Sequence, residues 1–120
     1  MGKLDGKITL VAGGAGYVGE GIVRAFLKEG ATVVVSARNT EKLEELRGLL
    51  GELASDRFVP ITGDFGQFEA AEHLRDEILN KFGRIDAVVA SLGGGWKGNQ
   101  PLTEVSMEDW QKYLQSNLTT

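Results

Sequence analysis

The sequence predicts an α/β fold, a doubly wound parallel sheet with helices on both faces. Short apolar runs alternate along the 120 residues with segments whose apolar residues recur at helical spacing. The run Thr32-Val-Val-Val35 shows no polar alternation, which is typical of a parallel strand buried on both faces. Right-handed crossovers between such strands favour the doubly wound arrangement. No linker or repeat interrupts the pattern, so residues 1–120 are expected to form a single domain.

The apolar runs predict four strands in a βαβαβαβα order. The first strand is expected at the run Ile-Thr-Leu-Val and the second at the valine run described above. The third and fourth strands are each expected to begin at an arginine, and the fourth contains Ala-Val-Val-Ala. The predicted ranges are 8–11, 31–36, 57–62 and 84–91.

Apolar stripes predict the helices between these strands. The first helix is expected over residues 17–29, with Gly30 after it, and the third is expected to stop at Gly83. Ser106 and Asp109 have the spacing of a capping box and open a fourth helix, in which Trp110 is expected to be a core residue. The second and third helices are identified by the apolar stripes Leu43, Leu46, Leu50, Leu53 and Phe68, Ala71, Leu74, Ile78, Phe82.

Composition excludes several classes of protein. A net charge of -4 gives no basic field for nucleic acid or an anionic membrane, and no apolar run is long enough for a membrane helix. The chain has no cysteine, and its single histidine, His73, falls on the polar side of the third helix, so no metal site is expected. The N-terminus lacks the apolar core of a signal peptide, which makes a cytoplasmic location the expectation.

A glycine-rich turn follows the first strand, with Gly13, Gly16 and Gly19 three residues apart. In a dinucleotide-binding βαβ unit, such glycines form a tight turn, admit the pyrophosphate and let the helix pack closely. The helix N-terminus offers free N–H groups and a positive dipole end to the anion. The alternative is a turn that needs glycine only for packing.

Five motifs follow one another along the chain. They are Leu4-Asp-Gly-Lys-Ile-Thr-Leu-Val-Ala-Gly-Gly-Ala-Gly-Tyr-Val-Gly19, Val35-Ser-Ala-Arg38, Gly63-Asp64, Asp86-Ala-Val-Val-Ala-Ser-Leu-Gly93 and Trp110 with Asn117-Leu-Thr. In this order they resemble the short-chain dehydrogenases/reductases, over the whole chain but only over the N-terminal half of a family member. The resemblance implies a Rossmann-like sheet in the order 3-2-1-4, truncated relative to the family, with a switch point between the first and fourth strands.

Two motifs depart from the family pattern. Ala12 stands where the family has a threonine, and it cannot donate that hydroxyl's hydrogen bond. The family's Asn-Asn-Ala-Gly after the fourth strand is Ala90-Ser-Leu-Gly93 here, which removes two asparagine side chains from the site.

The end of the second strand predicts the cofactor. An NAD-binding unit usually has Asp or Glu there to accept from the ribose 2′-OH, but this chain has Ala37 followed by Arg38. An arginine can pair with the 2′-phosphate, so NADP is expected and NAD is less favoured. The alternative for Arg38 is a solvated surface residue. Asp64 resembles the family's acceptor for the adenine amino group, and its alternative is the N-cap of the third helix.

The full predicted site combines these motifs. The one residue matched to the family's catalytic tetrad is Asn117, which orders a proton-relay water in the family. Trp96 is expected either to cover the nicotinamide or to hold its own loop. The predicted cofactor-binding residues are Gly13, Ala15, Gly16, Tyr17, Val18, Gly19, Ser36, Arg38, Asn39, Asp64, Phe65, Ala90 and Gly93.

The resemblance implies hydride transfer between a nicotinamide and a carbonyl or alcohol carbon. The family's acid is a tyrosine followed four residues later by lysine, with a serine nearby. Here Tyr17 and Tyr113 are followed at that spacing by Gly21 and Asn117, so the 120-residue chain is expected to be inactive alone.

The expected function is therefore the NADP(H)-binding part of an oxidoreductase, which would act on a small carbonyl or alcohol substrate if a catalytic half is supplied. The alternative is a non-catalytic nucleotide-binding or assembly module. The run Ala87-Val-Val-Ala90 would be an exposed sheet edge, which predicts a homodimer through the fourth strands or fourth helices.

Overall fold

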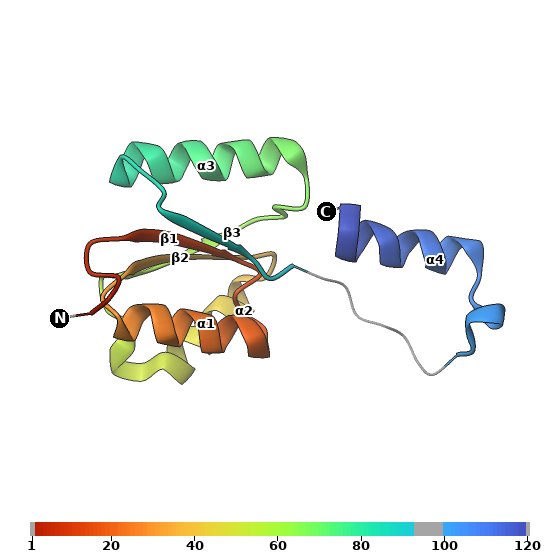
Figure 1. The fold of residues 1–120 in the computed structure, drawn as a ribbon, viewed down its shortest axis with the longest axis horizontal. Coiled ribbons are helices and arrows are strands. Elements are labelled where there is room, and N and C mark those ends of the chain that lie inside the picture. The colour runs from red at the N-terminus through yellow and green to blue at the C-terminus, as the bar shows by residue number, and fades with distance from the viewer. Residues whose placement is uncertain (1, 93–99, 120) are drawn as a thin grey trace.

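The computed structural model describes residues 2–92 and 100–119. Four parallel strands form one sheet in the order β3-β2-β1-β4. Figure 1 shows this sheet between layers of helices. This arrangement confirms the predicted Rossmann-like fold class and strand order. The order of strands along the chain reverses between β1 and β4, which is where ligands bind in open sheets of this kind.

Three of the strands lie within one residue of the predicted bounds. They are β1 (Ile8–Ala12), β2 (Thr32–Ala37) and β3 (Phe58–Thr62). The fourth, β4, covers only Ala87–Ala90 and is shorter than predicted. Its pairing with β1 ends where Ala90 meets Ala12. Before the strand, Asp86 donates its backbone N–H to the carbonyl oxygen of Ile8, and its side chain pairs with Arg84.

The helices begin and end at the expected signals. Helix α1 covers Tyr17–Lys28, α2 Thr40–Leu50, α3 Phe68–Phe82 and α4 Met107–Leu114. Gly30 and Gly83 follow α1 and α3 with φ angles of 91° and 81°, as a helix C-terminus favours. Gly51, with φ of 57°, ends α2 before Leu53, so the last leucine of the predicted stripe lies in the 3₁₀ helix η1 (Gly51–Leu53).

Two apolar clusters cover opposite faces of the sheet. One joins α1 and α2 to the sheet, and the other joins α3 to it, as the layers in Figure 1 show. The first contains Val11, Val23, Leu27, Ala31, Val33, Val35, Leu43, Leu46, Leu50 and Phe58, and the second contains Leu10, Val34, Leu74 and Ile78. Phe68 is 76% exposed, so the buried stripe of α3 begins after its first turn.

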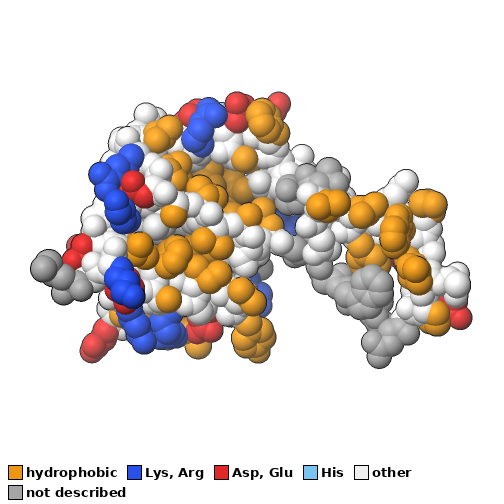
Figure 2. All heavy atoms as spheres, viewed as in Figure 1, with side chains coloured by type: hydrophobic (Ala, Val, Ile, Leu, Met, Phe, Trp, Pro, Cys, Tyr) orange, Lys and Arg blue, Asp and Glu red, His pale blue; other side chains and the backbone are white. Residues whose placement is uncertain are grey.

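Helix α4 lies apart from the sheet in Figure 1, and none of its residues is buried. The described part of the chain is consequently elongated, with extents of 52 × 29 × 25 Å. Figure 2 shows apolar side chains gathered over this helix. Trp110 is 45% exposed, so its prediction as a core residue is wrong: helical spacing reveals an apolar face but not whether anything packs on it. No helix within residues 2–92 and 100–119 is both long and apolar enough to cross a membrane.

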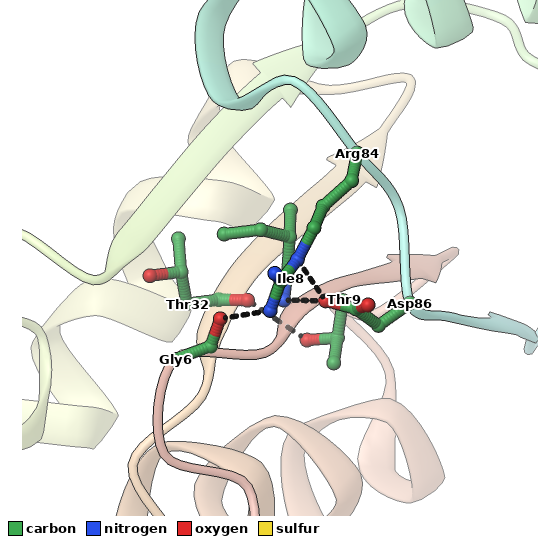
Figure 3. A network of polar contacts seen from close by, with 6 residues as sticks. All are labelled: Gly6, Ile8, Thr9, Thr32, Arg84 and Asp86. Atoms are coloured by element: carbon green, nitrogen blue, oxygen red, sulfur yellow. Dashed lines mark hydrogen bonds and ion pairs between the residues drawn. The ribbon is translucent and has the colours of Figure 1, made fainter.

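Asp86 ties the start of β4 to the start of β1. Its Oδ2 accepts from the backbone N–H of Ile8 at 2.8 Å and from Arg84 Nε at 2.9 Å. Arg84 Nη2 also donates to the carbonyl oxygen of Gly6 at 2.8 Å, as Figure 3 shows. These contacts lie at the amino ends of the strands, opposite the end at which a ligand is expected.

Candidate functional site

A cleft of about 670 Å³ lies at the carboxyl ends of the strands. Its walls are the turn after β1, the end of β2, the turn after β3 and the residues that follow β4. The volume falls within the range of small-molecule and cofactor sites. The described residues that line it are Gly13, Ala15, Gly16, Ser36, Ala37, Arg38, Asn39, Lys42, Gly63, Asp64, Phe65, Gly66, Gln67, Ser91, Leu92 and Gln115.

The first glycine makes the tight turn that leaves β1. Gly13 has a φ of 76° and donates its N–H to the carbonyl oxygen of Ser36 at 2.8 Å. A Cβ on Gly13 would lie 2.6 Å from the carbonyl oxygen of Ser91, so a side chain fits neither the conformation nor the space.

The second glycine is open to the cleft. Gly16 is the N-cap of α1, and a Cβ there would meet no atom within 4 Å. Its backbone is extended, so the fold does not require a residue without a side chain at this position. The free space and the helix N–H groups behind it are suited to an anionic group.

The third glycine serves packing. Gly19 is buried in α1, and a Cβ there would lie 2.5 Å from Gly14 Cα. Tyr17 and Val18 begin α1 but are 95% and 70% exposed and do not line the cleft. These three predicted cofactor residues therefore lie beside the cleft rather than in its wall.

The carboxyl end of β2 presents a cation and no carboxylate. Arg38 is exposed and lines the cleft. It follows Ala37, the position at which an NAD-binding unit usually has Asp or Glu. Asn39 Oδ1 accepts from the N–H of Glu41 at 2.8 Å, so this side chain caps α2. Ser36 is fully buried at the cleft floor, and its Oγ has no hydrogen-bond partner among the described residues.

The turn after β3 holds Asp64 and Phe65 in the wall of the cleft. Asp64 Oδ1 accepts from the N–H of Gly66 at 3.3 Å, which closes a local turn. Gln67 is the N-cap of α3, so the alternative of Asp64 as that N-cap is wrong. The Phe65 ring lies over Gly63, where a Cβ would approach the ring to 2.5 Å.

Two predicted residues lie away from the cleft wall. Ala90 is the last residue of β4 and does not line the cleft. Asn117 lies in the π-helical turn η3 (Gln115–Thr119), where its Nδ2 donates to the carbonyl oxygen of Tyr113 at 3.0 Å. The predictions for Gly93 and Trp96 lie outside the described residues.

Several lining residues were not in the predicted site. Lys42 lies in the first turn of α2 and lines the cleft. A lysine in the first turn, where acids are favoured, is the sequence signal that marks it. Ser91 and Leu92 follow β4 within the motif that ends at Gly93, and Gln115 reaches the cleft from η3, where no local motif identifies it.

The cleft is chemically suited to a nucleotide. Its described charged residues are Arg38, Lys42 and Asp64, so it offers cations at one end and a carboxylate acceptor at the turn after β3. Within the described ranges no group of three or more His, Asp or Glu side chains is placed to hold a metal ion. A glycine turn, an open helix N-terminus and a parallel sheet with a switch point together define a dinucleotide-binding α/β protein.

Comparison with known proteins makes the assignment more specific. A family model described as short chain dehydrogenase matches residues 7–120, and the chain belongs to this family. Among curated relatives, D-threitol dehydrogenase from Mycolicibacterium smegmatis is 34% identical over 119 residues, which cover 98% of this chain and 44% of the relative. The chain thus spans less than half the length of that relative.

Among solved structures of similar fold, one holds NADP and another holds NADH. ElxO with NADP bound is 26% identical, with a TM-score of 0.84 over 94% of this chain and 45% of that chain. The 3-ketoacyl-(acyl-carrier-protein) reductase from Brucella melitensis, complexed with NADH, is 26% identical, with a TM-score of 0.81 over 98% of this chain and 46% of that chain.

Proposed function

We propose that this chain is the NADP(H)-binding part of a short-chain oxidoreductase. The observation that carries the proposal is the end of β2, where Arg38 lines the cleft and Ala37 takes the place of an acid. An aspartate or glutamate there would accept from a ribose 2′-OH and repel a 2′-phosphate. A guanidinium instead forms paired charge-assisted hydrogen bonds with a phosphate.

Residues around the rest of the cleft account for the other parts of the cofactor. The open surface at Gly16 and the N-terminus of α1 suit the pyrophosphate. Asp64 and Phe65, on the turn after β3, suit the adenine as a hydrogen-bond acceptor and an apolar contact. Gly13, Ala15, Ser36 and Asn39 complete the proposed contacts in the cleft wall.

The similar structures support a nicotinamide dinucleotide as the cofactor. They do not distinguish NADP from NAD, because one holds NADP and another NADH. The preference for NADP therefore rests on Arg38. When bound, the nicotinamide gives or accepts a hydride at a carbonyl or alcohol carbon of the substrate.

Binding without turnover is the proposed behaviour of these 120 residues. Neither Tyr17 nor Tyr113 has a lysine four residues later, so the acid that the family uses is not among them. Asn117, the residue matched to the proton relay, bonds the backbone within its own helix turn. A cytoplasmic location is part of the same proposal.

Calorimetric titration with NADP+ and NAD+ tests this function. Wild-type chain is expected to bind NADP+ more tightly, and Arg38→Asp is expected to weaken NADP+ binding at least about 30-fold, because it removes a charge-assisted contact and adds repulsion. Arg75→Asp makes the same change of charge on exposed α3 and should leave both affinities unchanged. Equal or tighter binding of NAD+ by the wild type would contradict the proposal.

A second candidate function is assembly. Strand β4 forms an edge of the sheet, and Val88 on it is 61% exposed. The apolar face of α4 adds Met107, Trp110 and Leu114, which are 69%, 45% and 41% exposed. Exposed apolar edges and faces of this kind favour pairing, and a two-fold homodimer is the commonest closure.

A further inference from the structure

One residue in the wall of the cleft comes from the helical segment that follows the sheet. Of the described residues after Leu92, only Gln115 lines the cleft. It is the first residue of η3, which continues α4, and its backbone is still helical, with φ of -61° and ψ of -46°. The rest of α4 lies apart from the sheet in Figure 1. Gln115 therefore connects α4 to the ligand-binding end of the sheet.

The described wall of the cleft is charged on one side and uncharged on the other. Its charged residues come from the β2–α2 connection and from the turn after β3, whereas the wall beyond β4 consists of Ser91, Leu92 and Gln115. A dinucleotide lies across the point where the strand order reverses, so one half of it extends from β1 toward β4. The uncharged wall suits an uncharged part of that half.

The chemistry of glutamine matches a ribose better than a phosphate. The carboxamide carries no net charge, and it has two N–H donors and an oxygen that accepts. A hydroxyl also donates and accepts, so the two groups can pair without leaving a charge unbalanced. Of the three wall residues beyond β4, Gln115 has the longest polar side chain.

Packing within the described residues holds α4 only weakly. None of its residues is buried, and Met107 and Trp110 are 69% and 45% exposed. Segments with few buried apolar contacts open at the lowest free-energy cost. A ligand that touches both the sheet and Gln115 would add a contact that only the bound state has, so its binding would stabilise α4.

We propose that Gln115 is a cofactor-binding residue that hydrogen-bonds a ribose hydroxyl of the dinucleotide, and that this contact couples α4 to cofactor binding. The inference rests on the proposed function and extends it to a segment outside the sheet. The contact does not involve the 2′-phosphate, so it acts equally on NADP(H) and NAD(H). Arg38, in contrast, is proposed to act on the difference between these cofactors.

Calorimetric titration with NADP+ and NAD+ tests the contact in the variants Gln115→Met and Gln111→Met. Methionine has nearly the length of glutamine but no amide, so the substitution removes hydrogen bonds with little change of shape. Gln115→Met is expected to raise the Kd about fivefold for both cofactors. Gln111 is exposed on α4 and does not line the cleft, so Gln111→Met should leave both Kd values unchanged.

Amide hydrogen exchange, followed by mass spectrometry, tests the coupling. Exchange in residues 107–119 of the wild type is expected to slow about fivefold or more when NADP+ saturates the cleft. At the same occupancy Gln115→Met should lose this protection, and Gln111→Met should keep it. Urea denaturation of each variant without cofactor separates a lost contact from a damaged fold, because Gln115 is exposed and its replacement should leave the free energy of unfolding unchanged.

Four outcomes decide the inference. Weaker binding of both cofactors and loss of α4 protection in Gln115→Met, at wild-type stability and with neither effect in Gln111→Met, support it. Unchanged Kd values in Gln115→Met, or no slowing of exchange in wild-type α4, overturn it while the proposed function stands. A loss confined to NADP+, an equal loss in Gln111→Met or a fall in the stability of Gln115→Met also overturns it. Absence of binding of either cofactor to the wild type overturns the proposed function and this inference together.

Discussion

Glycines in the first turn and helix are needed for different physical reasons. Gly13 has a positive φ and no space for a Cβ, whereas a Cβ on Gly16 would meet no atom within 4 Å. Gly19 has an ordinary helical backbone but lies against Gly14. Each of the three glycines therefore has a distinct structural reason.

Replacement of Gly19 by alanine should destabilise the fold. The added Cβ would lie 2.5 Å from the backbone of Gly14, which cannot rotate away as a flexible side chain can. The free energy of unfolding is expected to fall by about 1–3 kcal/mol, the usual cost of overpacking. Urea denaturation followed by circular dichroism measures this change.

Gly21→Ala is the matched control within the same helix. A Cβ at Gly21 meets no atom within 4 Å, so the substitution should raise the free energy of unfolding by up to about 1 kcal/mol through helix propensity. If Gly19→Ala were as stable as Gly21→Ala, the packing role of Gly19 would be wrong.

At the scale of elements, strand β4 depends on Asp86. The strand has four residues and one partner strand, so its backbone pairing is limited. The Asp86 carboxylate adds a bond to the N–H of Ile8 on β1 and a pair with Arg84. The hydrogen bond from Ile8 is the main cause that lowers the pKa of Asp86 from its usual value of 3.8, with Arg84 adding to it against partial desolvation.

Stability should depend on pH through this carboxyl. Because its pKa is lower in the folded chain, Asp86 stabilises the fold above the unfolded pKa, and this contribution is lost as the pH falls through the folded pKa, below 3.8. Asp86→Asn cannot ionise but keeps an acceptor for Ile8. Urea unfolding between about pH 6 and pH 2 is expected to show a smaller loss of stability in Asp86→Asn than in the wild type. Parallel pH profiles for the two proteins would refute this stabilising role of the Asp86 carboxylate.

At the scale of the whole molecule, β4 and α4 present exposed apolar side chains, Val88 on β4 and Met107, Trp110 and Leu114 on α4. Strand β4 lies at the edge of the sheet that the described residues form, and α4 lies apart from the layers of sheet and helices. Figure 2 shows the apolar side chains that α4 presents. The proposed homodimer would cover the edge or the helix face with the same surface of a second copy.

Val88→Lys tests whether the edge is the contact. Val88 is 61% exposed, so the folded monomer should tolerate the change, while a lysine on an edge strand opposes strand pairing. Sedimentation velocity at micromolar concentration should show a dimer for the wild type and a monomer for Val88→Lys. Leu49→Lys, at a residue 62% exposed on α2, is the control and should remain a dimer. A wild-type monomer would contradict the homodimer.

The sequence by itself determined the local structure and the order of strands and helices along the chain. Apolar period, the glycines after α1 and α3 and the serine at the start of α4 act over a few residues, so they can be recognised without coordinates. The glycine turn and Arg38 were found in the same way, because both belong to the connections that directly follow β1 and β2.

Only the tertiary structure decided which side chains share a surface. The contact between Asp86 and Ile8 joins residues 78 positions apart, and Gln115 reaches a cleft that begins at Gly13. The exposure of Trp110 and the position of Lys42 in the cleft wall likewise depend on how whole elements are placed. An apolar stripe or a charged helix face is a property of one segment, whereas burial and site membership depend on its neighbours in space.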